Sequence, residues 1–195
     1  MLGWLAHAFA TIRPSSHAAA CTISRCAVPM TGAALASRLP LLGGVLYLPA
    51  RCAVSASDAA LPPGWLAARR ELSPLLETQE LVVSSMIGAD GPREWIDCVD
   101  AAGHPCARLH LLPDTDYLAW DALLSKSRPL PPVPLGPEQV SCRASHAELV
   151  CFRVRRLGAL DVLETLPSGP LSALGHHLAQ EIARAAAVEL EPARD

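Results

Sequence analysis

The stretch from Arg93 to Lys126 constrains the fold more than any other part of this sequence, because it predicts a strand, a turn, a strand and a helix in direct succession. Two strand candidates, residues 95–99 and 107–111, flank Asp100-Ala101-Ala102-Gly103. Aspartate commonly opens a type I turn, and glycine readily takes the left-handed conformation of a bulged hairpin. The sequence therefore predicts an antiparallel hairpin here.

The turn type also predicts which side chains share a face of this hairpin. It places Cys98 opposite Cys106, and side chains alternate between the two faces along each strand. The more apolar face, which we expect to pack inward, carries Trp95, Asp97, Val99, Ala107, Leu109 and Leu111. The other face carries Ile96, Cys98, Cys106, Arg108 and His110.

A helix is predicted directly after the hairpin. Pro113-Asp114-Thr115-Asp116 offers capping oxygens and negative charge at a helix start, which favours a capping role for both aspartates over paired carboxylates for acid–base chemistry. An apolar stripe at helical spacing follows in Tyr117, Trp120, Leu123 and Leu124. These positions predict an amphipathic helix.

Shorter patterns add elements on both sides of this region. Residues 41–48 predict a short buried strand at which the domain begins, and residues 81–86 predict a β-branched strand. The spacing of apolar residues from Trp65 to Leu76 predicts one bent helix or two short ones. Residues 139–143 and 148–156 predict a second antiparallel hairpin.

The expected fold class is α+β. A final amphipathic helix is predicted over about residues 171–190, with an apolar stripe that includes Leu174 and Ile182. Hydrophobic residues make up 51% of the chain and charged residues 18%, which excludes broad disorder. We therefore expect a single domain over residues 39–190, in which an antiparallel sheet built from hairpins carries packed helices.

Two segments are expected to lie outside the regular elements. Residues 1–38 mix Ala, Ser, Thr and His without a sustained hydrophobic period. This predicts either a mobile tail or a translation start that was assigned too far upstream. Five prolines fall between Arg128 and Pro137, which predicts a stiff, extended connector over residues 128–137. A PxxP ligand for a partner protein is the alternative interpretation of this connector.

The charge distribution bears on partners. The first 57 residues contain four arginines and no acidic residue, so the net charge of −3 leaves a balance of −7 for the rest. This is the wrong sign for a nucleic-acid-binding domain, which must neutralise phosphates. No stretch reaches the roughly 20 apolar residues of a membrane-spanning helix.

Cysteine usage favours a cytoplasmic location. Seven cysteines are scattered without a C-x-x-C pair, which predicts reduced thiols rather than a disulfide framework or a structural zinc site. A periplasmic location is the alternative, if Met30 begins a signal peptide whose apolar segment is Leu39 to Ala50.

Signatures of common enzymes are absent from the sequence. It has no G-x-S-x-G, no phosphate-binding glycine loop and no H-E-x-x-H, which removes support for an ordinary hydrolase or nucleotide enzyme. Cys98, His104, Cys106 and His110 are metal-binding residue types. Strand alternation leaves at most three of them on one face, however, and a closed zinc site needs four ligands.

The segment from Ile96 to Asp121 resembles part of the bacterial hemin transport proteins, relatives of intracellular haem-handling and hemin-degrading families. The similarity lies in the aspartate–glycine turn, the Leu111-Leu112-Pro113-Asp114 corner and the aromatic-rich helix, and it extends over about residues 45–124 and, more weakly, 139–188. It implies a cytoplasmic α+β domain that binds haem in a cleft and acts in haem uptake, transport or utilisation.

A haem site needs an apolar slot, an axial ligand such as His, Cys or Tyr, and a cation for the propionates. His110 and Arg108, on one predicted face, are our candidate ligand and cation, with Cys106 or His146 as alternative ligands. We expect a binding protein rather than an enzyme, with haem as partner, a homodimer left open and no nucleic acid. The alternatives are a haem-degrading enzyme and a module that binds another protein through the proline-rich connector or the last helix.

Overall fold

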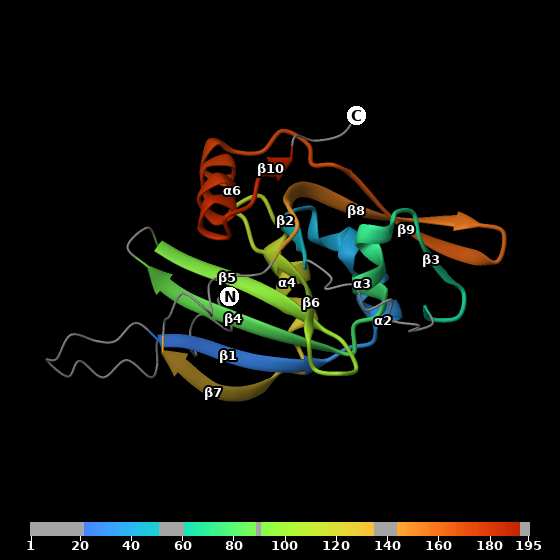
Figure 1. Ribbon diagram of the computed structural model, residues 1–195, viewed down its shortest axis with the longest axis horizontal. Helices are drawn as coiled ribbons and strands as arrows, with labels where there is room; N and C mark the ends of the chain where they lie inside the picture. The colour runs from blue at the N-terminus through green and yellow to red at the C-terminus, as the bar shows by residue number, and fades with distance from the viewer. Residues whose placement is uncertain (1–21, 51–60, 89–90, 135–143, 192–195) are drawn as a thin grey trace, which may run out of the picture.

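The structure is a computed structural model that describes residues 22–50, 61–88, 91–134 and 144–191. Its main feature is one large, mostly antiparallel sheet (Figure 1). The ten strands found in these residues are β1 (Thr22–Pro29), β2 (Gly44–Pro49), β3 (Trp65–Ala67), β4 (Glu80–Gly88), β5 (Gly91–Val99), β6 (Pro105–His110), β7 (Arg128–Pro134), β8 (Ala147–Leu157), β9 (Leu160–Pro167) and β10 (Leu190–Glu191). Their order in the sheet is β3-β9-β8-β2-β6-β5-β4-β1-β7, and β10 pairs with β8. The α+β class predicted from the sequence is confirmed.

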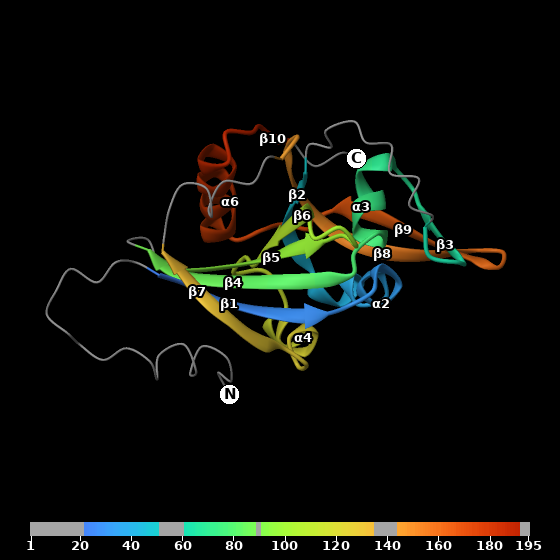
Figure 2. The same ribbon diagram turned by 60° about the horizontal axis from the view of Figure 1, so that its bottom comes forward.

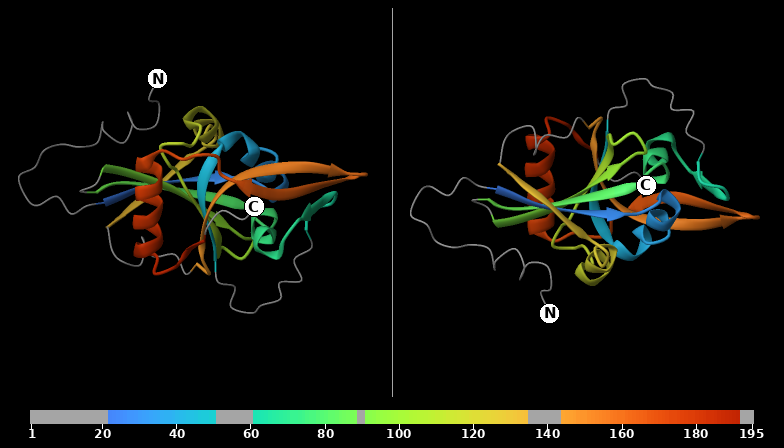
Figure 3. Two further views of the ribbon diagram at one scale, coloured as in Figure 1. Left: turned by 90° about the horizontal axis from the view of Figure 1, so that it is seen from above. Right: turned by 90° about the horizontal axis from the view of Figure 1, so that it is seen from below.

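Short helices and one longer helix cover the two faces of the sheet. The helical elements are α2 (Gly32–Ala36), η1 (Leu39–Leu42), η2 (Arg70–Leu72), α3 (Ser73–Leu76), α4 (Tyr117–Leu123) and α6 (Ala173–Ala185), where η marks a 3-10 helix. The main core includes buried residues of α2, η1, α3 and α4, whereas α6 packs over a second, smaller core. Figures 2 and 3 show α6 and α4 on opposite sides of the strands.

Strand β2 joins these two cores. All of its residues are buried; Val45 and Tyr47 belong to the main core, and Leu46 and Leu48 belong to the smaller one. This is the strand expected over residues 41–48, but η1 occupies the start of that range. Residues 39–50, which the secretory alternative takes as the apolar segment of a signal peptide, contain η1 and the whole of the buried strand β2.

The prediction that the first 38 residues are a tail is wrong from Thr22 onward. Strand β1 lies between β4 and β7 and pairs with both, and its Cys26 and Val28 are buried in the main core. Ser24 and Arg25 interrupt the apolar residues of this strand, so no hydrophobic period marks it in the sequence. Residues 1–21 lie outside the described part of the chain.

The proline-rich segment is a strand rather than a connector. Residues 128–134 form β7, an edge strand that pairs with β1 on one side. Proline is tolerated in an edge strand because its missing N–H can face the side where no strand pairs, so no hydrogen bond between strands is lost. Proline also discourages the pairing of a further strand at that edge. The remaining residues of the predicted connector, 135–137, lie outside the described residues.

Two further predictions were incorrect in part. Residues 65–67 are strand β3, parallel to β9, so only residues 70–76 of the predicted helical region are helical. Strand β8 pairs with β9 across a tight turn at Gly158, whose φ is +61°, and β9 was not predicted. The partner expected for β8, residues 139–143, lies outside the described residues.

The helix after the hairpin is confirmed as α4. The Asp116 carboxylate accepts hydrogen bonds from the backbone N–H of Leu118 and Ala119, so Asp116 is its N-cap. Trp120 and Leu123 are buried, but Tyr117 is 51% exposed and is not part of the packed stripe. Within the described residues, none of the helices has the length and apolar character needed to cross a membrane.

Candidate functional site

A β-bulge between β5 and β6 decides which side chains meet in this hairpin. Gly103 has a φ of +83°, and the Asp100 carboxylate accepts hydrogen bonds from the backbone N–H of Ala102 and His104, both at 2.8 Å. Cys98 pairs with Ala107, and the register shifts before Val99 pairs with Pro105. The predicted pairing of Cys98 with Cys106 is therefore wrong.

Because of this shift, the side chains of β5 and β6 that share a face of the sheet differ from the predicted ones. Asp97 now pairs with Arg108, and Trp95 pairs with His110. A one-residue shift moves a whole set of side chains to the other face. The main core receives Ile96, Cys98, Ala107 and Leu109. The opposite face carries Trp95, Asp97, Arg108 and His110, which the sequence had not placed together.

This polar face forms one wall of a pocket beneath α6. The pocket contains about 360 Å³ of empty space, part of it open to solvent. The sheet contributes two guanidinium groups, an indole and an imidazole, which belong to Arg93, Trp95, Arg108 and His110. Apolar side chains from β2, β4 and the C-terminal end of α6 complete the lining: Leu48, Met86, Ile182, Ala185 and Ala186.

A buried ion pair fixes the polar wall. Arg108 donates to Asp97 through Nε, at 2.6 Å, and through Nη2, at 3.1 Å. Trp95 Nε1 also donates to Asp97, at 3.2 Å, and the Arg108 guanidinium lies 5.3 Å from the centre of the Trp95 ring. Because Trp95 and Arg108 are 3% and 6% exposed, these contacts hold both side chains in defined positions.

His110 is neutral in this pocket at physiological pH. Burial is the main cause, and the positive charges of Arg108 and Arg93 add to it, so the pKa of His110 lies well below 6.5. A neutral imidazole keeps a lone pair on one ring nitrogen, which can accept a hydrogen bond or bind a metal.

Helix α6, the other wall of the pocket, is fastened to the corner before α4. Asp114 accepts hydrogen bonds from the backbone N–H and the hydroxyl of Ser172, the N-cap of α6, at 2.8 and 3.0 Å. The approach is so close that a Cβ on Gly175 would lie 2.0 Å from the Asp114 carboxylate. Asp114 therefore anchors α6 rather than starting α4. Leu174, expected on the packed stripe of α6, is 56% exposed.

The structure brings together two of the four candidate haem residues. Arg108 and His110 line the pocket, whereas Cys106 and His146 are not among its lining residues. The Cys106 thiol contacts the backbone oxygens of Pro74 and Cys98 on the core side of the hairpin. The metal-binding residue types noted near the turn are likewise divided between the core, the exposed turn and the pocket.

Arg93, Met86 and the residues of α6 were missed by sequence reasoning as parts of this site. Arg93 lies two residues before Trp95 in β5, so the alternation of a strand places it on the same face. That signal was present in the sequence. The position of α6 over this face depends on contacts far apart in the chain and had no local signal.

A second group with a shifted pKa, Glu94, lies on the other face of β5. Its pKa is raised to about 7, mainly by burial; the hydrogen bond from Trp120 Nε1, 2.6 Å long, opposes the shift, and the charge of Asp121 adds to it. Glu94 thus becomes protonated at a pH at which most carboxyl groups are ionised.

Glu94 and His110 should make stability depend on pH in opposite directions. Because the pKa of Glu94 is raised, this residue contributes to the free energy of unfolding. The contribution is fully present below pH 4.5 and is lost as the pH rises through about 7. Because the pKa of His110 is lowered, its contribution to the free energy of unfolding is fully present above pH 6.5 and is lost as the pH falls. Between these limits the two contributions oppose each other.

Single variants should separate the two contributions. In Glu94→Gln only the His110 contribution remains, so acidification from pH 6.5 to 4.5 should lower the free energy of unfolding, relative to wild type, by up to about 1.4 kcal/mol per pH unit. His110→Gln should show the opposite change. Urea denaturation at several pH values measures both effects, and equal pH slopes in the three proteins would contradict the expectation.

No family model, no curated protein and no solved structure shows a significant match to this chain. The resemblance of residues 96–121 to hemin transport proteins therefore stays a prediction.

Proposed function

We propose that this protein binds haem in the pocket beneath α6 and acts in haem uptake, transport or utilisation. The observation that carries the proposal is the position of a neutral, buried imidazole, His110, in the same apolar pocket as the guanidinium groups of Arg93 and Arg108. These are the chemical groups that an iron ligand and propionate partners require.

The donor set of the pocket fits haem. The neutral imidazole of His110 would hold the haem iron, and bound haem would supply a redox-active metal. The walls from Leu48, Met86 and Ile182 are apolar, and Trp95 offers a flat aromatic surface. Asp97 holds Arg108 in place, while Arg93, on the same wall, is only half-buried and lies nearer to solvent.

The available space sets a condition on binding. The enclosed part of the pocket is small, because its roughly 360 Å³ of empty space includes open solvent, and haem does not fit into it without a movement of the walls. Haem binding therefore requires α6 to move away from the sheet.

Hemin titration tests the proposal. The wild-type protein should give a saturable shift of the Soret band at one equivalent of hemin, and His110→Ala should weaken binding by at least about tenfold because it removes the imidazole that would hold the iron. Ile182→Trp, which fills the pocket and leaves His110 in place, should weaken binding as well.

His104→Ala is the matched control, because the His104 side chain is 80% exposed in the turn of the same hairpin. It should bind hemin like the wild type. A titration without saturation, or one that is the same in His110→Ala and His104→Ala, would refute the site. Addition of ascorbate to the complex separates binding from turnover, since loss of the Soret band with release of iron would show a haem-degrading enzyme.

A further inference from the structure

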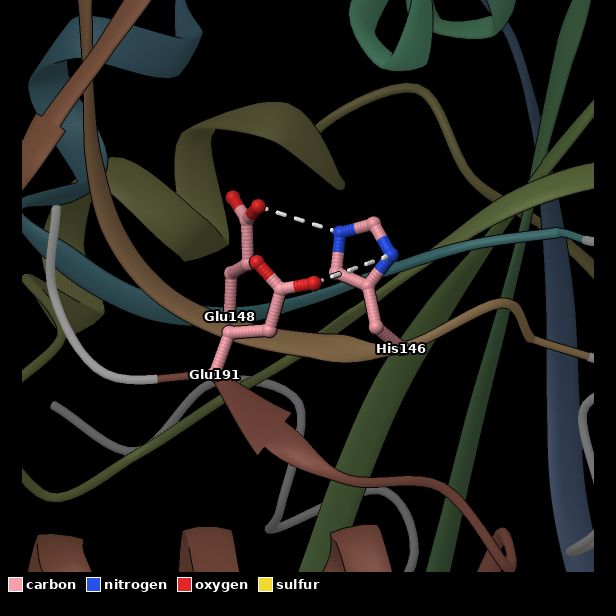
Figure 4. Close-up of side chains that lie close together, drawn as sticks. All are labelled: His146, Glu148 and Glu191. Carbon is pink, nitrogen blue, oxygen red and sulfur yellow. Dashed lines mark hydrogen bonds and ion pairs between the residues drawn. The ribbon is translucent and has the colours of Figure 1, made fainter.

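A second cluster of metal-binding residue types lies where the last strand meets β8. Parallel pairing of β10 with β8 sets Glu191 beside Glu148. His146 precedes Glu148 by two residues, so the alternation of an extended chain puts its side chain on the same face. Figure 4 shows the imidazole of His146 with both carboxylates directed toward it.

We propose that His146, Glu148 and Glu191 bind a divalent transition-metal ion of the zinc class. One ring nitrogen of His146 and one oxygen of each glutamate all lie within 4.8 Å of one another. Metal–ligand bonds of about 2.0–2.2 Å hold tetrahedral ligand atoms roughly 3.3 Å apart, so small side-chain rotations complete the site. The separation of 3.0 Å between His146 Nε2 and a Glu148 oxygen already satisfies this spacing.

Burial distinguishes this cluster from acidic groups on an open surface. The side chains of His146, Glu148 and Glu191 are 14%, 8% and 26% exposed. The Glu148 carboxylate keeps its ion pair with Arg69, which holds it in place beside the imidazole and Glu191. The Glu191 side chain is partly exposed, so a bound divalent ion would take a water ligand from solvent on that side.

Neighbouring residues orient two of the three ligands. The Ser145 hydroxyl lies 2.9 Å from His146 Nδ1, so it can accept the Nδ1 proton and leave the lone pair of Nε2 directed at Glu148. Glu191 lies 3.8 Å from Nδ1, so its carboxylate would have to turn toward Nε2 to share the ion. Arg69 Nη1 donates to Glu148 at 2.6 Å, and Nη2 contacts the second carboxylate oxygen.

The donor set selects the class of ion. Imidazole together with carboxylate suits Zn²⁺ and its first-row neighbours, whereas Ca²⁺ and Mg²⁺ prefer sites made of oxygen ligands. Three protein ligands leave at least one coordination position for water, which is the arrangement of open zinc sites rather than closed structural ones. A bound ion would also link β10 to β8, because Glu191 is in the last described strand.

Calorimetric titration of the metal-free full chain with Zn²⁺ tests the site. We expect one equivalent of saturable binding in the wild type, and at least about a tenfold loss of affinity in Glu191→Gln and in His146→Ala. Zn²⁺ should raise the melting temperature of the wild type more than that of either variant. Glu191→Gln is the decisive variant, since it changes a partly exposed side chain in a two-residue edge strand.

Glu189→Gln is the matched control, because Glu189 is exposed and lies two residues before Glu191. It should bind Zn²⁺ like the wild type. Co²⁺ in place of Zn²⁺ should give a spectrum without thiolate charge-transfer bands. Absence of saturable binding, equal affinities in Glu191→Gln and Glu189→Gln, or a thiolate band from the cysteines would each overturn the proposal. Hemin binding at His110 is a separate measurement and should be unchanged in Glu191→Gln.

Discussion

Replacing Asp97 by alanine should lower the free energy of unfolding by about 3–5 kcal/mol. The substitution removes the carboxylate that accepts two hydrogen bonds from Arg108 and one from Trp95. The Arg108 side chain is 7% exposed, so its charge would remain in a poorly solvated place without this carboxylate. Chemical denaturation of wild type and variant measures the loss, and hemin binding should weaken because the pocket wall loses its fixed geometry.

Two controls separate the buried pair from ion pairing in general. Glu164→Ala breaks the ion pairs with the half-exposed Arg153 and Arg155 on the β8–β9 hairpin, and should cost under about 1 kcal/mol. The double variant Asp97→Ala, Arg108→Met should recover part of the stability lost in Asp97→Ala, because the buried charge of Arg108 is then removed as well. If Asp97→Ala costs no more than Glu164→Ala, the pair does not hold the pocket wall.

Replacing Gly32 by alanine should destabilise the protein by about 3 kcal/mol. Gly32 begins α2 where this helix packs on α3, and an added Cβ would lie 1.9 Å from the backbone oxygen of Leu76 and 2.3 Å from its carbonyl carbon. Backbone atoms cannot rotate away, so α2 must separate from α3 and loosen the main core around Leu35. The overlap outweighs the gain of up to about 1 kcal/mol that alanine normally brings to a helix.

Gly169→Ala is the matched control for this prediction. An added Cβ at Gly169 meets nothing within 4 Å, and its φ lies outside the left-handed region, so the variant should be as stable as the wild type. Urea denaturation compares the two alanine variants under the same conditions. Equal stabilities for Gly32→Ala and Gly169→Ala would show that α2 and α3 are not in close contact.

The region from β5 to α4 shows how far sequence reasoning reaches. The turn at Asp100, the left-handed Gly103 and the Asp116 cap follow from local hydrogen bonds and allowed backbone angles, and the structure contains all three. The register of the strands could not be read in the same way. A bulge adds one residue at Cys106, and that single residue decides whether Trp95 shares a face with Leu109 or with His110.

The candidate site was accessible from the sequence only in part. His110 and Arg108 alternate along one strand, so their common face followed from the period of two. The bulge separates these two residues from Cys106 and places Trp95 on their face of the sheet. His146 was noted as a haem ligand, but Glu148 and Glu191 approach it only because β10 returns to pair with β8, which joins residues more than forty positions apart.

The sequence by itself therefore determined the α+β class, the hairpin turn, the capped helix α4 and the shared face of Arg108 and His110. Each depends on interactions between residues only a few positions apart. Only the tertiary structure decided that residues 22–29 and the proline-rich residues 128–134 are paired strands, and that α6 covers His110. These features depend on partners that are distant in the chain. Strands β1 and β7 form because each completes the backbone hydrogen bonding of a neighbouring strand. Helix α6 covers the pocket because Asp114 holds its first turn.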